Sequence, residues 1–207
     1  MDVVSFFLSF VFQLFLILDP VGNMPIFLSL TESNSHKERI KIAKRAIIIA
    51  GIVLIFFVLF SWIILSYFGI SIYAIQIGGG ILLFFIGIEM LYGRNTKTKF
   101  TESEHELASK QEDVSVTPLA MPLLAGPGSI TTAILFSQSS PFLTYNLILI
   151  GGIVIVLSIS YLLLANSDKI IKKLGELGTK ALVRFMGLMI VFISIQYIID
   201  GMKFFFL

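Results

Sequence analysis

Residues 19–25 read Asp-Pro-Val-Gly-Asn-Met-Pro, and they interrupt an apolar stretch that is long enough to cross a membrane. A second cluster, residues 122–129, reads Pro-Leu-Leu-Ala-Gly-Pro-Gly-Ser inside another such stretch. Proline removes a backbone donor and glycine loosens a helix, so we expect each cluster to free backbone groups at membrane depth. Such groups are tolerated only where they line a cavity or a binding site. Paired interruptions in the two halves of a membrane protein are typical of transporter sites.

The composition is that of an integral membrane protein. Of the 207 residues, 57% are hydrophobic and only 14% are charged, and a soluble domain of this length cannot bury so much apolar surface. The chain has no cysteine, which excludes disulfides, thiolate metal sites and cysteine nucleophiles. Its two histidines, His36 and His105, lie in charged segments and form no ligand cluster. The first residues lack a basic n-region, so we expect the first apolar stretch to be retained.

Runs without charge divide the chain into six membrane spans. Residues 46–88 and 114–167 contain no charged side chain, and each run is long enough for two spans. This pattern predicts a first three-helix repeat at 1–92, a polar loop at 93–113 and a second three-helix repeat at 114–207. The expected helices lie at about 3–30, 45–66, 72–92, 114–138, 143–164 and 181–204.

The distribution of lysine and arginine predicts the orientation. Segments 31–45, 93–113 and 165–184 hold 14 of the 15 basic residues. In a six-span chain all three segments lie on one face, which the positive-inside rule places in the cytoplasm. We therefore expect a multi-pass protein of the inner (plasma) membrane with both termini outside the cytoplasm. The 93–113 loop is most simply a solvated linker, and a regulatory role is the alternative.

The two halves align without gaps when the first is shifted by 107 residues. Pro20 then meets Pro127, Gly80 meets Gly187, and Gly87 meets Ser194. Small residues seven positions apart share one helix face and permit close helix contact. Because each half has three spans, the second half enters the membrane from the opposite side, and the pattern predicts an inverted repeat.

Asp19 is the only acidic residue deep inside an apolar segment. A carboxylate at that depth costs at least about 2.5–3.5 kcal/mol on insertion scales, so a functional role is the default interpretation. The alternative is that Asp19 caps a restarted helix by accepting from the amides near Gly22 and Asn23, and both roles can coexist. Glu89 and Asp200 lie near span ends, and we expect both to reach the interface rather than a transport pathway.

Uncharged polar residues follow both interruptions. They are Asn23, Ser129, Thr131 and Thr132. Helices that restart there would point free N–H groups and positive dipole ends at the membrane centre, which suits a carboxylate. The preceding half-helices, ending near Leu18 and Ala125, would offer carbonyls to an ammonium or a small cation. The alternative is that the interruptions only kink the helices and the hydroxyls bond back to the preceding turn. For Gln13, Gln138 and Gln196, a hydrogen bond between helices is the favoured role, and lining a cavity is the other.

Both clusters resemble the signatures of a known family. Residues 18–27, followed by Leu30 and Thr31, are similar to the first signature of the MarC family of six-span inner-membrane proteins, which reads Asp-Pro-x-Gly-x-x-Pro. Residues 122–132 are similar to the second signature. The resemblance covers essentially the whole chain. The family is also called the neutral amino acid transporter family, so the resemblance implies a secondary transporter of small neutral amino acids. It also implies a site between the first and fourth spans.

We therefore expect an all-α membrane protein of six transmembrane helices in two inverted repeats, with the first and fourth helices broken mid-membrane. The expected function is transport of glycine, alanine or serine by alternating access. The partners would be a small zwitterionic amino acid and the lipid bilayer, with no nucleic acid. We expect no resident cofactor or metal, and a coupling proton or sodium ion and a homo-oligomer stay open. The candidate substrate-binding residues are Asp19, Pro20, Gly22, Asn23, Pro25, Gly126, Pro127, Gly128, Ser129, Thr131 and Thr132.

Two other functions compete with this interpretation. The first is export of another metabolite or drug, and the second is a membrane scaffold that transports nothing. A scaffold would not need polar interruptions at matched depth in both halves. An enzyme is the least favoured class, because the sequence has no nucleophile with its base and only one deep acid.

Overall fold

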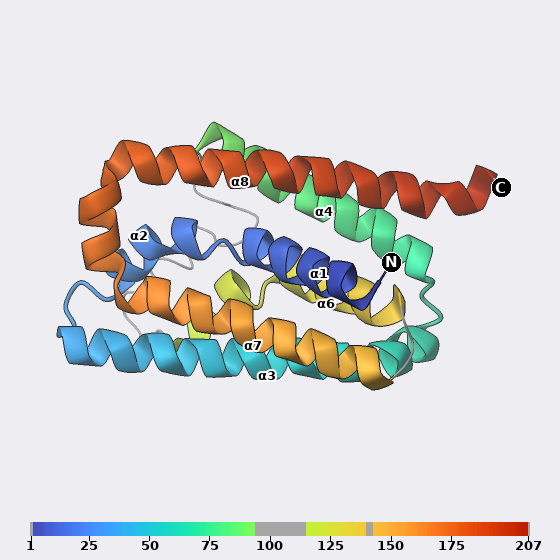
Figure 1. Ribbon diagram of the computed structural model, residues 1–207, viewed down its shortest axis with the longest axis horizontal. Coiled ribbons are helices and arrows are strands. Elements are labelled where there is room, and N and C mark those ends of the chain that lie inside the picture. The colour runs from blue at the N-terminus through green and yellow to red at the C-terminus, as the bar shows by residue number, and fades with distance from the viewer. Residues whose placement is uncertain (1, 94–114, 140–142, 207) are drawn as a thin grey trace.

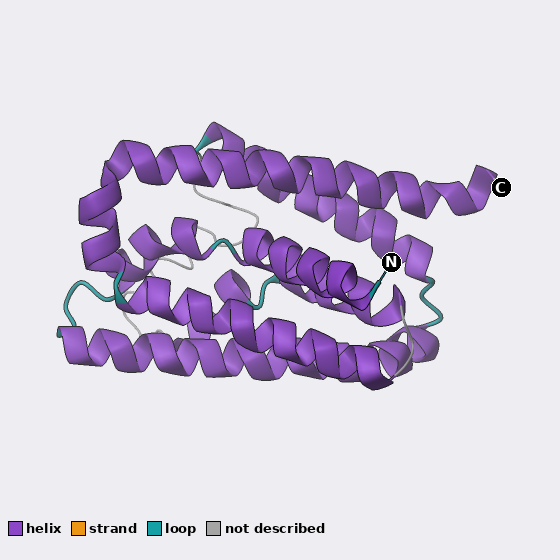
Figure 2. Cartoon of the chain, in the orientation of Figure 1, coloured by secondary structure: helices purple, strands orange, loops and turns teal. Residues whose placement is uncertain are grey.

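The computed structural model describes residues 2–93, 115–139 and 143–206, and these residues contain helices and no strand (Figure 2). Five helical stretches are long and apolar enough to cross a membrane, and a bent pair supplies a sixth. The expected all-helical membrane fold is therefore confirmed, while the loop predicted at 93–113 lies outside the described residues except for Gly93. In chain order the helices are α1 (Val3–Leu18), α2 (Pro20–Leu30), α3 (His36–Phe68), α4 (Ile72–Tyr92), η1 (Ser115–Leu124), α6 (Pro127–Ser139), α7 (Leu143–Ala165) and α8 (Ser167–Phe206).

The long helices run side by side along the long axis of the molecule (Figure 1). The N-terminal and C-terminal ends lie at the same end of this bundle, on the right in the view. The α2–α3 and α7–α8 connections lie at the opposite end. An even number of spans places both termini at the same end of the bundle. The basic segments 31–45 and 165–184 both lie toward the opposite end.

Helix α3 begins nine residues earlier than the predicted 45–66 span. Ser35 starts it with a capping box, in which Glu38 Oε2 accepts from the Ser35 amide at 2.8 Å and Ser35 Oγ accepts from the Glu38 amide. The helix ends at Gly69, whose φ of 65° is easily reached only by glycine. The basic residues of this segment therefore lie on the first turns of a helix, because the cap extends it beyond the apolar run.

The segment 165–184, predicted as a loop, is largely helical, so that boundary was wrong. Helix α8 begins at Ser167 and bends at Gly175, where φ is 71° and ψ is 170°. Figure 1 shows the short first part crossing the end of the bundle and the long second part running back along it. Arg39 on α3 fixes this corner, because its Nη1 lies 3.2 Å from Asp168 Oδ2 and its Nε donates to the Thr31 carbonyl at 2.9 Å.

Helices that occupy corresponding places in the two halves pack against each other: α4 against α8, and α3 against α7. Glycine makes the α4–α8 contact close. A Cβ atom at Gly87 would lie 2.9 Å from the Gly187 carbonyl oxygen, and a Cβ at Gly80 would lie 2.8 Å from the Ser194 carbonyl oxygen. A shift of 107 residues makes Gly80 correspond to Gly187 and Gly87 to Ser194. The Gly87–Gly187 contact in one half therefore corresponds to the Ser194–Gly80 contact in the other. Such reciprocal contacts are expected of an inverted repeat, which itself stays a prediction.

Candidate functional site

The first interruption is a single residue, Asp19, rather than several residues within 19–25. Helix α1 ends at Leu18, Asp19 has left-handed φ and ψ of 52° and 57°, and Pro20 is the first residue of α2. Aspartate tolerates this conformation better than most residues, and proline at a helix start needs no N–H partner. The Asp19 amide donates to Phe15 O at 3.1 Å, and Asp19 Oδ1 accepts from the Gly22 amide at 2.9 Å. Asp19 thus ends one helix and caps the next.

The second interruption falls within the predicted 122–129, but irregular backbone begins earlier, because Thr117 and Met121 inside η1 have non-helical φ and ψ. Ala125 and Gly126 separate η1 from α6, which are bent by 54° relative to each other, and Pro127 begins α6. The Ala125 amide donates to Ala120 O at 2.8 Å. A Cβ atom at Gly126 would collide with the Pro122 carbonyl oxygen, so only glycine fits. Gly126 and Asp19 are 107 residues apart, and each directly precedes the proline that begins the second half-helix.

A polar side chain reaches back across each interruption. Asn23 Nδ2 donates to the Leu18 carbonyl at 2.8 Å, and Ser129 Oγ donates to the Leu124 carbonyl at 3.0 Å. Both bonds span five residues and satisfy the last carbonyl of the preceding half-helix. The carbonyls expected to face an ammonium are therefore occupied in this conformation.

The amides that the sequence predicted to be free differ between the two interruptions. At the first, the prediction was wrong, because Asp19 accepts from Gly22 through its side chain and from Asn23 through its carbonyl, the latter at 3.0 Å. At the second, helix geometry leaves the amides of Gly128 and Ser129 without an acceptor inside α6. The anion-attracting helix start is therefore that of α6.

The predicted residues divide by burial. Those buried inside the bundle are Asp19, Pro20, Asn23, Gly126, Gly128, Ser129 and Thr132. Gly22 and Thr131 are half-buried, whereas Pro25 and Pro127 are exposed. Thr132 Oγ1 donates to the Gly128 carbonyl at 3.0 Å, as the kinked-helix alternative expected for hydroxyls. Thr131 instead turns to α4, where a Cβ atom at Gly79 would meet its methyl group.

The two interruptions meet inside the bundle. A Cβ atom at Gly128 would lie 3.0 Å from Ile17 Cγ2 and 2.9 Å from Leu83 Cδ2, so α1 and α4 close over the start of α6. A small cavity, here termed the break cavity, remains between Ile17, Ile86, Leu123 and residues 126–129. Its volume is about 10 Å³, which is at the lower limit for one water molecule. The site is therefore closed in this conformation.

The charge inside this part of the bundle is a single carboxylate. Among the described residues, Asp19, at 5% exposure, is the only charged residue that is buried. No buried lysine or arginine accompanies it in the described ranges. A solute with a second uncompensated charge would therefore have to be desolvated here at high cost.

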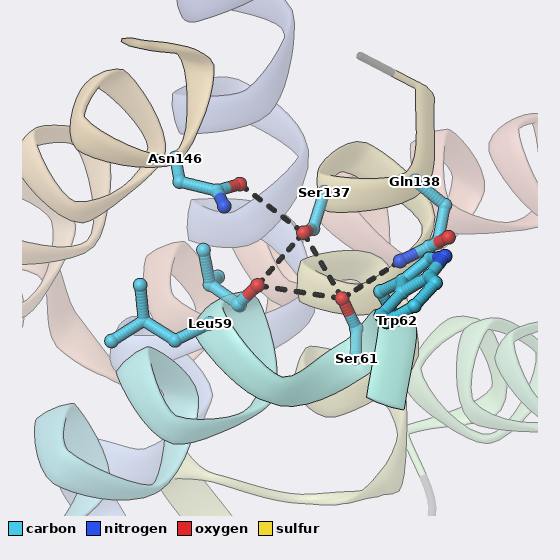
Figure 3. Close-up of a pocket in the computed structure, with 7 residues that line it drawn as sticks. Leu59, Ser61, Trp62, Ser137, Gln138 and Asn146 are labelled. Carbon is cyan, nitrogen blue, oxygen red and sulfur yellow. Dashed lines mark hydrogen bonds between the residues drawn. The ribbon is translucent and has the colours of Figure 1, made fainter. Parts of the chain in front are cut away.

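A second polar cluster, shown in Figure 3, was not predicted from the sequence. Ser61 on α3, Ser137 and Gln138 on α6 and Asn146 on α7 surround a cavity of about 210 Å³, here termed the serine cavity. The sequence feature that could have indicated this cluster is the presence of these polar residues inside apolar spans. Gln138 does bond between helices, since its Nε2 donates to Ser61 Oγ at 2.9 Å.

The other two glutamines gave opposite outcomes. Gln13 on α1 accepts from the Tyr197 hydroxyl on α8 at 2.6 Å, which confirms a hydrogen bond between helices. Gln196 was predicted to do the same, but its amide donates to Asp200 one turn along α8, at 2.9 Å.

Residues 4–206 match a family described as "MarC family integral membrane protein". The UPF0056 membrane protein MJ1677 of Methanocaldococcus jannaschii is 39% identical over 203 residues, which cover 98% of each chain. The UPF0056 membrane protein YvbG of Bacillus subtilis is 33% identical over 200 residues, covering 96% of this chain and 95% of that one. No solved structure matches.

Proposed function

Because this chain belongs to the MarC family of integral membrane proteins, we propose that it is a secondary transporter of small neutral amino acids. The observation that carries the proposal is the matched pair of interruptions at Asp19 and Gly126, buried inside a bundle of membrane-length helices. Irregular backbone at membrane depth is tolerated where it is enclosed by protein or lines a cavity. Two broken helices in corresponding positions are the arrangement that secondary transporters use to hold a solute.

The substrate carboxylate binds at the start of α6 in this proposal. The amides of Gly128 and Ser129 have no acceptor within the helix, and the positive end of the helix dipole lies there. The ammonium binds at the carbonyls of Leu18 and Leu124, assisted by Asp19. Asn23 and Ser129, which bond to these carbonyls in the closed conformation, turn away when the substrate replaces them.

The charge of the site favours a net-neutral substrate. A zwitterion brings one charge of each sign, and the site offers an amide-rich helix start for one and carbonyls with a carboxylate for the other. A glutamate side chain would add a negative charge near Asp19, and like charges repel strongly in low dielectric. A lysine side chain would need a second buried acid, and among the described residues Asp19 is the only one that is buried.

Substrate entry requires the two interruptions to separate. The break cavity, at about 10 Å³, holds at most one water molecule, so the closed conformation excludes even glycine. Its walls are Ile17, Ile86 and Leu123, which favours small side chains. Movement of one three-helix unit against the other opens the site first to one side and then to the other. The reciprocal α4–α8 contacts support such an inverted pair.

The same breaks would serve an exporter of another metabolite or drug, and the charge argument then restricts the solute to net-neutral molecules. A scaffold is disfavoured, because it would not need polar interruptions at matched depth in both halves of the chain. By the positive-inside rule, we also propose that the chain lies in the plasma membrane and that the basic end of the bundle faces the cytoplasm.

Uptake into proteoliposomes tests the proposal. Labelled glycine and alanine, under imposed proton or sodium gradients, should accumulate with the wild-type chain. Gly126→Ala should abolish this uptake, because its methyl group collides with the Pro122 carbonyl. Gly151→Ala is the matched control, because a Cβ atom there has nothing within 4 Å. Folded wild-type protein that accumulates neither amino acid under either gradient would overturn the proposed function.

A further inference from the structure

The serine cavity lies away from the two interruptions, toward the end of the bundle that carries both termini. Its walls come from the last third of α3, the end of α6 and the beginning of α7, which meet at the right in Figure 1. Its volume of about 210 Å³ compares with about 10 Å³ for the break cavity. The closed conformation thus has room for a small solute in the serine cavity and none at the breaks.

The lining combines apolar side chains with polar groups and contains no charged residue. Ser137 Oγ lies 2.8 Å from the Val58 carbonyl oxygen, 3.1 Å from Ser61 Oγ and 3.3 Å from Asn146 Oδ1 (Figure 3). Ser61 and Ser137 are buried at 1% and 5% exposure. The cavity therefore presents both donors and acceptors without a net charge. This chemistry suits a net-neutral solute that carries both kinds of group.

A second cavity adjoins the serine cavity toward the end of the bundle. It has a volume of about 370 Å³ and lies over the α3–α4 turn, beside Ser66, Gly69 and Ser71. Trp62 and Gln138 line both cavities. Trp62 is 68% exposed, so one side of it lies on the outer surface of the bundle. Trp62 and Gln138 therefore separate the second cavity from the buried serines.

Helix α6 links the serine cavity to the breaks. Ser137 and Ser129 are both buried on this helix, eight residues and about 12 Å apart along its axis. The serine cavity and the start of α6 are therefore about two helical turns apart on the same helix.

We propose that the serine cavity is a second substrate site, which holds the neutral amino acid at the terminus-bearing end of the transporter. In the empty cavity the Gln138 amide donates to Ser61 Oγ, and the Ser137 hydroxyl lies within hydrogen-bond distance of the Val58 carbonyl and Asn146 Oδ1. When the substrate binds, Gln138 and Ser137 turn to donate to its carboxylate, and the Asn146 Oδ1 and Val58 carbonyl that they leave accept from its ammonium. This inference rests on the proposed function. The competing role for these residues is that of hydrogen bonds that only hold α3, α6 and α7 together.

Cysteine labelling separates these roles, because the natural chain has no cysteine that would react. Leu59→Cys places a thiol in the cavity wall, and Phe60→Cys is the matched control on the neighbouring position of α3. The two side chains are 43% and 42% exposed, and only Leu59 lines the cavity. In purified full-length protein, saturating alanine should slow maleimide labelling of Leu59→Cys at least about tenfold by occupancy. Labelling of Phe60→Cys should not change.

Two further variants assign the protection to the cavity. Ser137→Ala, combined with Leu59→Cys, should raise the half-protecting alanine concentration about tenfold, because one buried hydrogen bond is lost. Asp19→Asn, combined with Leu59→Cys, should lose uptake and keep the protection. If Asp19→Asn abolishes protection, alanine slows labelling by binding at the two interruptions and changing the conformation around residue 59. The inference of a second site is then wrong.

The remaining outcomes distinguish this inference from the proposed function. Absence of protection in a Leu59→Cys protein that still accumulates alanine overturns the second site and leaves the transporter proposal intact. Protection without any uptake supports the cavity as a binding site and counts against transport. Protection by lysine or by sodium ions equal to that by alanine would show a cation site and overturn the inference.

Discussion

The side-chain amide of Asn23 donates to the carbonyl of Leu18 at 2.8 Å, across the interruption between α1 and α2. Ser129 makes the corresponding bond to Leu124 at 3.0 Å in the second half. A carbonyl at a helix end has no amide four residues ahead of it, so at membrane depth it needs another donor. Each side chain supplies that donor in the closed conformation.

Ser129→Ala should lower stability more than the same change at an exposed serine. It removes the donor of the Leu124 carbonyl, and an unsatisfied buried carbonyl costs about 1–3 kcal/mol. Ser158→Ala is the matched control, because its hydroxyl donates at 2.7 Å to Val154 O inside α7, where the helix also satisfies that carbonyl. Thermal unfolding of the two purified variants measures the difference. Equal melting temperatures would show that the bond across the break contributes nothing.

Asp19→Asn should reduce uptake at least about tenfold, because a charge-assisted hydrogen bond to the substrate is worth about 1.5–3 kcal/mol. Asparagine also tolerates the left-handed conformation and also caps helices, so the fold should persist. Glu89→Gln and Asp200→Asn, near span ends, are the controls and should change uptake much less. Wild-type uptake by Asp19→Asn at matched expression would reduce Asp19 to a helix cap.

Gly87→Ala should destabilise the α4–α8 contact. The added methyl group would lie 2.9 Å from the Gly187 carbonyl oxygen, and overpacking of this kind costs about 1–3 kcal/mol. Gly78→Ala on the same helix meets nothing within 4 Å, and replacing a helical glycine by alanine gains up to about 1 kcal/mol. The two variants should therefore shift the melting temperature in opposite directions. A stabilising Gly87→Ala would contradict the close packing.

The basic segments should face the cytoplasm and both termini should lie outside. The reason is the placement of 14 of 15 basic residues in three segments on one face of a six-span chain. Reporter fusions near Lys99 and at Leu207 test this topology, with a cytoplasmic signal expected only near Lys99. A cytoplasmic signal at Leu207 would reverse the orientation.

The interruptions could be located from sequence because proline and glycine act locally. Pro20 and Pro127 each begin a half-helix, where a missing N–H costs nothing. The width of the first interruption could not be predicted, because it depends on Asp19 adopting a left-handed conformation and accepting from two amides at once. Pro25 illustrates the limit, since it lies inside α2 on an exposed face.

Helix boundaries in the basic segments escaped prediction for a different reason. Hydropathy locates the membrane-embedded part of a helix, whereas caps decide where the helix begins. The Ser35–Glu38 capping box and the bend at Gly175 place charged residues on helices outside the apolar runs. The serine cavity was missed because Ser61, Ser137 and Asn146 are brought together only when α3, α6 and α7 pack.

Competition for uptake should rank glycine, alanine and serine above glutamate and lysine. The start of α6 binds a carboxylate through amides and the helix dipole, and among the described residues no lysine or arginine is buried to take its place. Glutamate would bring a second negative charge close to Asp19, and lysine would bring a positive charge with no second buried acid to meet it.

Esterified glycine extends this prediction to the carboxylate itself. The ester has the size of a small amino acid but lacks the negative charge that the α6 amides attract, so its inhibition constant should rise at least about tenfold, which corresponds to about 1.4 kcal/mol. The measurement is inhibition of labelled alanine uptake in proteoliposomes, with serine as the positive control. If the ester competes as well as glycine, or if glutamate or lysine competes better than alanine, the carboxylate does not bind at Gly128 and Ser129.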